Sequence, residues 1–408
     1  MLHKKQFVCI SAFSLSLALL LSPILGFGAE KYVTYLNLTD YTGPIAGFGV
    51  YESMGLSDVF KDINNRGGIE GVKVKFIGVD TRYDLAHAVS AFNRYRMEHK
   101  LLLIEAPSTA LAKVVGPILS RDRLSVLTPG DGESEARPGR IFLFGVTYQN
   151  GFAAAIDWMI EDWQKKGNPR KPIVGYIGWD NPYGKEALLG GKEYADKIGV
   201  KLLPPEFFPP GSLKLDVWLN RLAQGGANYI YVSGTDPAPT KVIQDAYALG
   251  LTKKIQMVTD FYGPCMGVGV KAHPKELEGT VITSFYLRGV EAFEHTSSRY
   301  WKKYREKPLS EMTDSYILGL INGLTFETAL KVGLKEVGYD KLDSEAMYKV
   351  FQKLTDMDVN EGLTSLCAYS STSRQRSKQI KFYRVTNARV VPFTGWRIAP
   401  DAVSLHKW

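Results

Sequence analysis

The amino-acid sequence predicts an α/β protein with two lobes, each built on a mainly parallel β-sheet flanked by helices. Two patterns and the chain length predict this class. Strand-like apolar runs alternate with helical patterns up to about residue 150, and a second alternating set begins there. Of the 408 residues, about 380 follow an apolar N-terminal segment, which is enough for two substantial cores.

The N-terminal segment has the pattern of a cleaved signal peptide. Lys4 and Lys5 precede a mostly apolar run over 7–25, which serines and a proline interrupt and which ends in the small residues of "GFGAE". A single membrane anchor is the alternative, because the run is about long enough to span a bilayer. We expect a signal peptide over residues 1–28 and a soluble, exported protein, since we find no second apolar run of that length.

Charge and cysteine content exclude some partners. The formal charge of +8 falls to +6 when the two lysines of the signal leave, and basic and acidic residues are interspersed. Without a basic-aromatic module, no nucleic acid partner is expected.

Cys265 and Cys367 remain after processing, and the sequence leaves open whether they form a disulfide.

The first alternating set contains four expected strands and three expected helices. Glycines in "NRGGIEG" end the first helix. The strands are expected at 32–38, 72–79, 101–106 and 124–129, and the helices at 52–66, 84–99 and 108–121.

The second set continues the same alternation. A helix is expected at 153–163, a strand at 172–179, a single helix at 182–198, a strand at 229–234, a helix at 237–249 and a strand at 254–260. The chain is then largely helical from about 283 to 357. Two strand-like runs, 378–385 and 388–398, flank a turn at Thr386–Asn387.

No catalytic constellation is recognisable in the sequence. The histidines are not paired at helical spacing, and the chain has no H-E-x-x-H, no G-x-S-x-G, no C-x-x-C and no EF-hand loop. We therefore expect a protein that is not an enzyme and uses no cofactor and no metal. A secreted α/β enzyme remains an alternative.

The stretch "TGPIAGFGVYESMG", residues 42–55, follows the first strand and contains Gly43, Gly47 and Gly49. Such glycines often keep a backbone close to a ligand. No Gly-Lys-Ser/Thr ending follows, and the G-x-G-x-x-G spacing of a dinucleotide site is absent. The loop is therefore expected to contact something other than a nucleotide.

Several motifs in a fixed order carry a family resemblance. They are the run from "YLNLTDYTGPIAGFG" through "INNRGGIEG" to "DLAHAV", then "APSTALAKVVGPILSRDRLSVLTPG", "WDNPYGKEAL" and "GTDPAPTKVIQDAYALGL". Together they resemble the branched-chain amino acid (Leu/Ile/Val) binding proteins of ABC importers, clearly over about 32–290. The resemblance implies the type I periplasmic binding fold, with the ligand cleft between two hinged lobes.

The resemblance also implies domain boundaries. The first lobe is expected to comprise 29–147 and about 285–365, and the second 148–284 and about 366–408. The chain should cross between lobes near 144–150, 282–288 and 362–370.

Ligand-binding residues of the first lobe follow from matching positions. Phe48 matches an aromatic residue placed against the ligand, although it could instead fill its own lobe. The turn "EAPSTA" matches one that binds the ligand's carboxylate, although capping of the next helix is the simpler account. In "TPGDGE", Asp131 could cap the next segment or face the ligand. The candidates here are Phe48, Ala106, Ser108, Thr109, Gly130, Asp131 and Gly132.

The second lobe adds five candidates. Tyr183 matches a tyrosine that closes over the ligand, and Trp179 is a possible ring wall. Asp260 matches the acid that receives an ammonium group, although an acid at a strand exit is also a common turn former. The candidates are Trp179, Tyr183, Thr235, Asp260 and Tyr262.

The sequence therefore predicts the substrate-binding component of an ABC importer. It would be a monomer that captures a small amino-acid-like or carboxylate solute in the periplasm and delivers it to a membrane permease. A periplasmic sensor of amides, urea or amino acids with the same fold is the alternative. The sequence identifies neither the ligand nor the permease.

Overall fold

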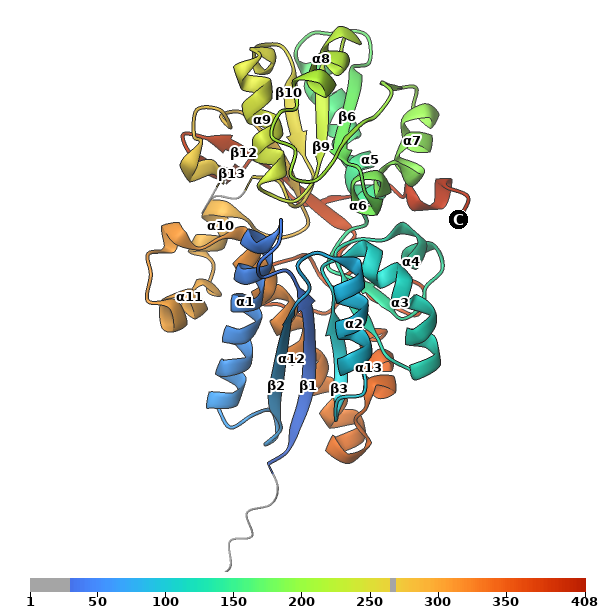
Figure 1. Cartoon of the computed structure of the whole chain (residues 1–408), viewed down its shortest axis with the longest axis vertical. Coiled ribbons are helices and arrows are strands. Elements are labelled where there is room, and N and C mark those ends of the chain that lie inside the picture. Colours follow the sequence, from blue (N-terminus) through green and yellow to red (C-terminus); the bar gives the residue numbers. More distant parts are fainter. Residues whose placement is uncertain (1–29, 265–268) are drawn as a thin grey trace, which may run out of the picture.

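The computed structural model describes residues 30–264 and 269–408 (Figure 1). The predicted signal peptide and Cys265 of the possible disulfide lie outside the described residues. Two α/β units are stacked on each other, with the first sheet in the lower half of Figure 1 and the second in the upper half. The predicted fold class is confirmed.

The first sheet has five strands in the order β2-β1-β3-β4-β5, and all neighbours are parallel. β1 and β2 pair without a register shift from Tyr32 with Lys73 to Thr39 with Asp80. The strands are β1 (Tyr32–Thr39), β2 (Lys73–Asp80), β3 (Leu101–Glu105), β4 (Val126–Thr128) and β5 (Ile141–Leu143).

Alternating side chains of β1 divide between the two faces of this sheet. Val33 and Tyr35 belong to the main core with α1 and α12, whereas Leu36 and Leu38 pack in a second cluster with α2 and α3. The helices of this unit are α1 (Ala46–Asn65), α2 (Leu85–Tyr95), α3 (Thr109–Asp122), α4 (Gly132–Ala136), α11 (Ser298–Arg305), α12 (Asp314–Lys341) and α13 (Ser344–Phe351).

The second sheet combines parallel and antiparallel strands. Its main order is β13-β12-β11-β10-β9-β6-β7, and β12 runs antiparallel to β11 and β13. The strands are β6 (Ile173–Trp179), β7 (Lys201–Leu202), β8 (Glu206–Phe208), β9 (Tyr229–Ser233), β10 (Gln256–Thr259), β11 (Val281–Ser284), β12 (Gln379–Thr386), β13 (Arg389–Pro392) and β14 (Arg397–Ile398).

Helices flank this sheet as well (Figure 1). Short 3-10 turns occur at Leu251–Lys253, Leu309–Glu311 and Val403–Leu405 (η4). The α-helices are α5 (Tyr148–Lys165), α6 (Pro182–Glu186), α7 (Leu188–Lys197), α8 (Asp216–Gln224), α9 (Ala238–Ala248) and α10 (Gly289–Glu294), the last of which packs on β13.

Three segments of the chain pass between the sheets, after β5, after β11 and before β12. They contact one another, because Leu143 bridges to Gln375 and Tyr286 bridges to Thr364. The side chain of Gln375 also accepts a hydrogen bond from the amide of Thr147 at 2.9 Å. These passages lie where a hinge between two lobes would be, and the hinge itself remains a prediction.

The prediction of a single helix at 182–198 is wrong, because α6 ends at Glu186 and the backbone is non-helical at Leu189 and Gly190, near the start of α7. Gly190 has a φ of +100°, and a Cβ there would lie 2.2 Å from the carbonyl oxygen of Ala402. The backbone therefore breaks where the C-terminal segment packs against it, and only glycine fits both constraints.

α12 is the helix in the described part of the chain that is long and apolar enough to cross a membrane. It lies against α1 in the core, and 83% of its apolar window is buried. The sequence pattern predicts a largely helical segment here without marking it as a long apolar run.

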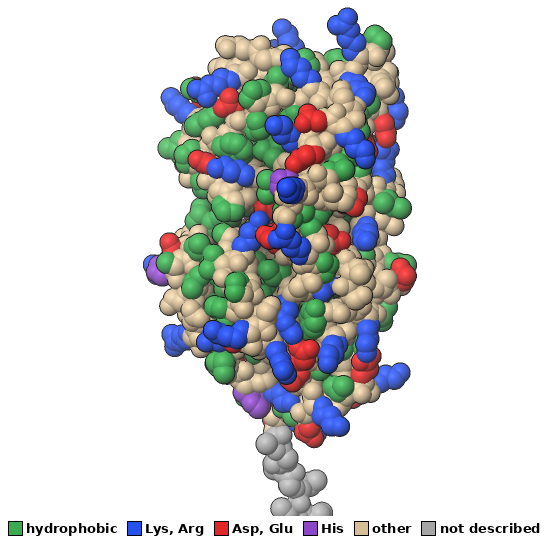
Figure 2. Space-filling model, turned by 90° about the vertical axis from the view of Figure 1, so that its right-hand side faces the viewer, with side chains coloured by type: hydrophobic (Ala, Val, Ile, Leu, Met, Phe, Trp, Pro, Cys, Tyr) green, Lys and Arg blue, Asp and Glu red, His purple; other side chains and the backbone are tan. Residues whose placement is uncertain are grey.

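On the surface, Figure 2 shows lysine and arginine side chains spread over the visible face with acidic side chains among them.

Candidate ligand cleft

The candidate residues converge because they follow the carboxyl ends of parallel strands in both sheets. Phe48 follows β1 and Thr109 follows β3, while Tyr183, Thr235 and Tyr262 follow β6, β9 and β10. In α/β proteins this edge of a sheet is where ligands bind. The two edges face each other across the junction of the two units.

Two cavities lie at this junction. The smaller has a volume of about 20 Å³, which is room for about one water molecule. Five of the ligand-binding residues predicted from the sequence line this cavity, so those five residues do lie close together. Its lining residues are Ile45, Phe48, Tyr83, Pro107, Thr109, Pro129, Tyr148, Tyr183, Thr235 and Tyr262.

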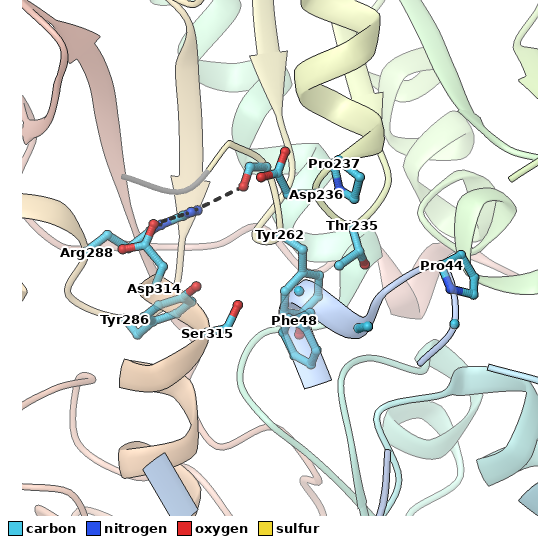
Figure 3. A pocket seen from close by; sticks show the side chains of 14 residues that line it. Pro44, Phe48, Thr235, Asp236, Pro237, Tyr262, Tyr286, Arg288, Asp314 and Ser315 are labelled. Carbon is cyan, nitrogen blue, oxygen red and sulfur yellow. Dashed lines mark hydrogen bonds and ion pairs between the residues drawn. The ribbon is translucent and has the colours of Figure 1, made fainter. Parts of the chain in front are cut away.

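The larger cavity, which we call the side chamber, has a volume of about 250 Å³. Phe48, Thr235 and Tyr262 separate it from the smaller cavity, since they line both. Figure 3 shows Asp314, Tyr286 and Ser315 on one side of the side chamber and Pro44, Thr235 and Pro237 on the other. Gly43, Pro44, Ala46, Gly47, Phe48, Thr235, Asp236, Pro237, Tyr262, Gly263, Tyr286, Arg288, Asp314 and Ser315 line it.

The three glycines of the first loop have different roles. A Cβ on Gly43 would lie 2.5 Å from the carbonyl oxygen of Arg82, and one on Gly49 would lie 2.0 Å from that of Asp40. These two glycines let the backbone pack within its own unit. Gly47 lines the side chamber, and nothing lies within 4 Å of a Cβ built there. Phe48 and Gly47 belong to the first turn of α1 and not to a loop.

Aromatic rings fill most of the space between the units. The Tyr148 ring packs against Tyr183 with centroids 4.9 Å apart, and the Tyr262 ring packs edge-to-face on Phe48 at 5.7 Å. Tyr148 lies so close to Gly130 that a Cβ there would be 2.7 Å from the ring. Gly130 therefore makes room for Tyr148 and lines neither cavity.

Asp260 is buried behind this aromatic cluster. Its carboxylate accepts hydrogen bonds from the Tyr183 hydroxyl at 2.7 Å, the Ser233 hydroxyl at 3.1 Å and the amide of Tyr262 at 3.1 Å. Burial raises its pKa to about 7, and these hydrogen bonds limit the rise. It lines neither cavity, so an ammonium group in either cavity would not contact it in this arrangement.

Asp260→Asn should change how stability depends on pH. An unfolded aspartic acid loses its proton near pH 4, whereas the folded one keeps it up to about pH 7. Between those values the folded state holds the extra proton, so stability should fall as pH rises, by up to about 1.4 kcal/mol per pH unit, and then level off. Urea unfolding from pH 4.5 to 7.5 should show that wild type loses stability relative to the variant. The exposed Asp196→Asn should follow wild type, and a constant difference between wild type and Asp260→Asn would contradict the assignment.

The turn before α3 uses its polar groups internally. The Ser108 hydroxyl accepts from the amide of Leu111 at 3.3 Å and so caps the helix, and the Thr109 hydroxyl donates to the carbonyl of Gly130 at 3.2 Å. The amide of Ala106 donates to Leu127 within the sheet. Ala106 and Ser108 line neither cavity.

Asp131 caps α4 and belongs to a buried charge cluster. It accepts from the amide of Ser134 at 3.3 Å, and its carboxylate lies 3.3 Å from Nζ of Lys113. Glu186 of α6 reaches Lys113 from the second unit at 2.9 Å and accepts from the amide of Gly132 at 3.1 Å. Burial raises the pKa of Glu186, and Lys113 opposes that rise. The cluster joins the two units beside the cleft.

A second buried ion pair forms one end of the side chamber. Arg288 donates to Asp314 through Nε at 3.1 Å and Nη2 at 2.8 Å, and also to the carbonyl of Phe261 at 3.0 Å. Both side chains are almost fully buried. The pair holds the passage after β11 to the loop after β10 and to the start of α12.

Trp179 lies outside both cleft cavities. Its ring packs near Tyr83 and Tyr183 and lines a separate cavity of about 370 Å³, whose walls come mostly from the second unit and, at Pro44, from the first. The sequence also missed several residues that the structure places at the cleft. Arg288 and Asp314 are 26 positions apart, and Tyr148 begins α5 directly after the first passage. An arginine in an expected interlobe passage was the only signal for this group.

Comparisons with known proteins agree with this architecture. The description of the matching family is "periplasmic binding protein", and the match covers residues 37–389. An "Amino acid binding protein" of Pseudomonas aeruginosa is 22% identical over 278 residues, which is 65% of this chain and 71% of that protein. A "Leu/Ile/Val-binding protein homolog 3" of Brucella melitensis is 25% identical over 215 residues, covering 52% of this chain and 57% of that relative.

Solved structures share the fold at low sequence identity. A branched-chain amino acid ABC transporter protein from Thermus thermophilus, solved with bound valine, matches with a TM-score of 0.80 at 15% identity, over 92% of this chain and 98% of that one. A fatty acid ABC transporter substrate-binding protein from Thermomonospora curvata matches with a TM-score of 0.74 at 18% identity, over 92% and 94%. Because the family match extends over most of the sequence, the chain belongs to the periplasmic binding protein family.

Proposed function

We propose that this protein is the substrate-binding component of an ABC importer and captures a small solute between its two lobes. The observation that carries the proposal is the side chamber, whose walls come from both α/β units and from the passage between them. A binding site shared in this way gains contacts when the lobes close, so ligand binding favours the closed form. The relatives named above for amino acids and fatty acids support a role in solute capture.

The volume of the side chamber supports a solute about the size of an amino acid. At roughly 30 Å³ per water molecule, about 250 Å³ corresponds to about eight waters. We propose that one lobe comprises 29–147 and about 285–365, and that the other comprises 148–284 and about 366–408. We also propose that the signal peptide is cleaved near residue 28, that the protein is a monomer and that it delivers its solute to a membrane permease. We expect no catalytic activity, because a binding protein must release its solute unchanged.

Retained solute and uptake test the proposal together. Native mass spectrometry of protein purified from the periplasm should show a bound small molecule that dissociates chemically unchanged. Deleting the gene should abolish uptake of that molecule, and re-expressing the wild-type chain should restore it. Unaltered uptake in the deletion strain would contradict the importer role and favour the sensor. Chemical conversion of the molecule by the protein would favour an enzyme.

A further inference from the structure

Charged side chains at the cleft have charged partners within the protein. Lys113 lies within 3.3 Å of Asp131 and 2.9 Å of Glu186, and Arg288 lies 2.8 Å from Asp314. These contacts use the charges that a charged solute would otherwise pair with. A zwitterion or a carboxylate entering the cleft would have to compete with carboxylates that are already in place.

The two remaining acids at the cleft are held by hydrogen bonds. Asp260 accepts from the hydroxyls of Tyr183 and Ser233, and Asp236 accepts from the Thr240 hydroxyl. Burial raises the pKa of Asp260 to about 7 and that of Asp236 to about 6. Both acids already accept hydrogen bonds within the protein, so a cationic solute would have to displace these partners to pair with either of them.

Apart from Thr235, Ser315, Asp236 and the Arg288–Asp314 pair, the side chains that line the side chamber are apolar or aromatic. Pro44 and Pro237 face the rings of Phe48, Tyr262 and Tyr286 across it. The Tyr262 hydroxyl is buried, and among the described residues it has no hydrogen-bond partner of normal geometry. Burial raises its pKa well above the usual value, and the nearby Tyr148 hydroxyl offsets only part of that rise. An unsatisfied buried hydroxyl is costly, so a solute that reaches it when the Tyr262 ring turns on binding would bind more tightly.

From these observations we propose that the cleft selects an uncharged solute with an apolar body and one hydrogen-bonding end, which meets the Tyr262 hydroxyl. The inference rests on the proposed function and defines the chemistry of the same site. Placing a charged group in this cleft without a counter-charge costs far more free energy than placing an uncharged amide or hydroxyl that is hydrogen-bonded. The inference differs from the amino-acid-like or carboxylate solute expected from the sequence, and one experiment decides between them.

Two series of compounds test this, because within each series the apolar part stays the same and only the charge of the end group changes. The first comprises phenylacetamide, phenylacetate, phenethylamine and phenylalanine, and the second comprises 3-methylbutanamide, 3-methylbutanoate, 3-methylbutylamine and leucine. Isothermal titration at pH 7.5 should show that the amide of at least one series binds more tightly than its three charged counterparts, on the order of tenfold or more. Equal or tighter binding of any charged member would overturn the inference.

Variants of the chain test whether the solute binds in the side chamber. Gly47→Leu adds a side chain at its wall where nothing lies within 4 Å, so the fold should be kept while affinity falls, on the order of tenfold. Gly395→Leu makes the same change at a site without neighbours outside the cleft and should bind as wild type. Tyr262→Phe keeps the ring and should weaken amide binding by about three- to tenfold. Unchanged affinity in both Gly47→Leu and Tyr262→Phe would overturn the placement.

If neither series binds, the solute retained by the native protein decides. An uncharged retained solute that Gly47→Leu loses supports the inference, and a retained amino acid, carboxylate or amine overturns it. Neither result affects the importer role, which fails separately if the deletion strain keeps its uptake.

Discussion

Arg288→Leu is expected to destabilise the protein by about 3–5 kcal/mol, because it breaks a buried ion pair by removing one partner. The Arg288 side chain is 1% exposed and that of Asp314 is 3% exposed, so the variant leaves a buried carboxylate without its counter-charge. It also removes the donor to the carbonyls of Phe261, Gly263 and Pro264. Each unsatisfied buried acceptor adds to the loss.

Urea unfolding of three variants measures this effect. Arg288→Leu combined with Asp314→Leu should be more stable than Arg288→Leu alone, because the unpaired charge is gone. Arg299→Leu is the matched control, since its pair with Glu361 is 49% and 37% exposed and should contribute less than about 1 kcal/mol. A loss from Arg288→Leu no greater than that of the control would show that the pair does not hold the passage in place.

Lys113→Met is expected to destabilise the protein by about 3 kcal/mol and to act on the contact between the lobes. Asp131 and Glu186 are each 2% exposed and would face each other without the ammonium group. The value is at the low end of the usual range because 30% of the Lys113 side chain is exposed. Since Asp131 lies in the first unit and Glu186 in the second, their repulsion should separate the units.

The dependence of this effect on pH follows from the raised pKa of Glu186. Below that pKa Glu186 is protonated and the repulsion disappears, so the destabilisation should be smaller at pH 5 than at pH 7.5. Urea unfolding at both pH values measures the loss of stability, and the radius of gyration from scattering shows whether the units separate. Lys353→Met, at an exposed pair with Glu336, is the control. Equal losses for both variants with an unchanged radius would contradict a role in closure.

Local patterns predicted the architecture because they depend on neighbouring residues. The strand-helix alternation and the helix caps are set within a few positions, and Ser108 and Asp131 act as caps in the structure. The family motifs brought Phe48, Thr235 and Tyr262 to one place, since all three follow parallel strands. These features required no knowledge of distant contacts.

The remaining features depend on contacts between residues far apart in the sequence. The break at Gly190 exists because Ala402 packs against it, more than 200 positions later. The carboxylate of Asp260 was predicted to receive the ligand's ammonium group. In the structure it accepts a hydrogen bond from the hydroxyl of Tyr183, which is 77 positions away in the sequence. The side chamber similarly depends on Arg288 pairing with Asp314. Periodicity and spacing in the sequence do not encode such pairings.

Small-angle scattering of the protein with and without its retained solute tests the central claim most directly. Capture between two lobes predicts that, at a solute concentration near the wild-type Kd, the solute lowers the radius of gyration of the wild type and of Gly395→Leu much more than that of Gly47→Leu, whose side chain occupies the wall of the side chamber. Identical scattering of the wild type in both states, with calorimetry showing saturated binding, would contradict capture by closure of the lobes.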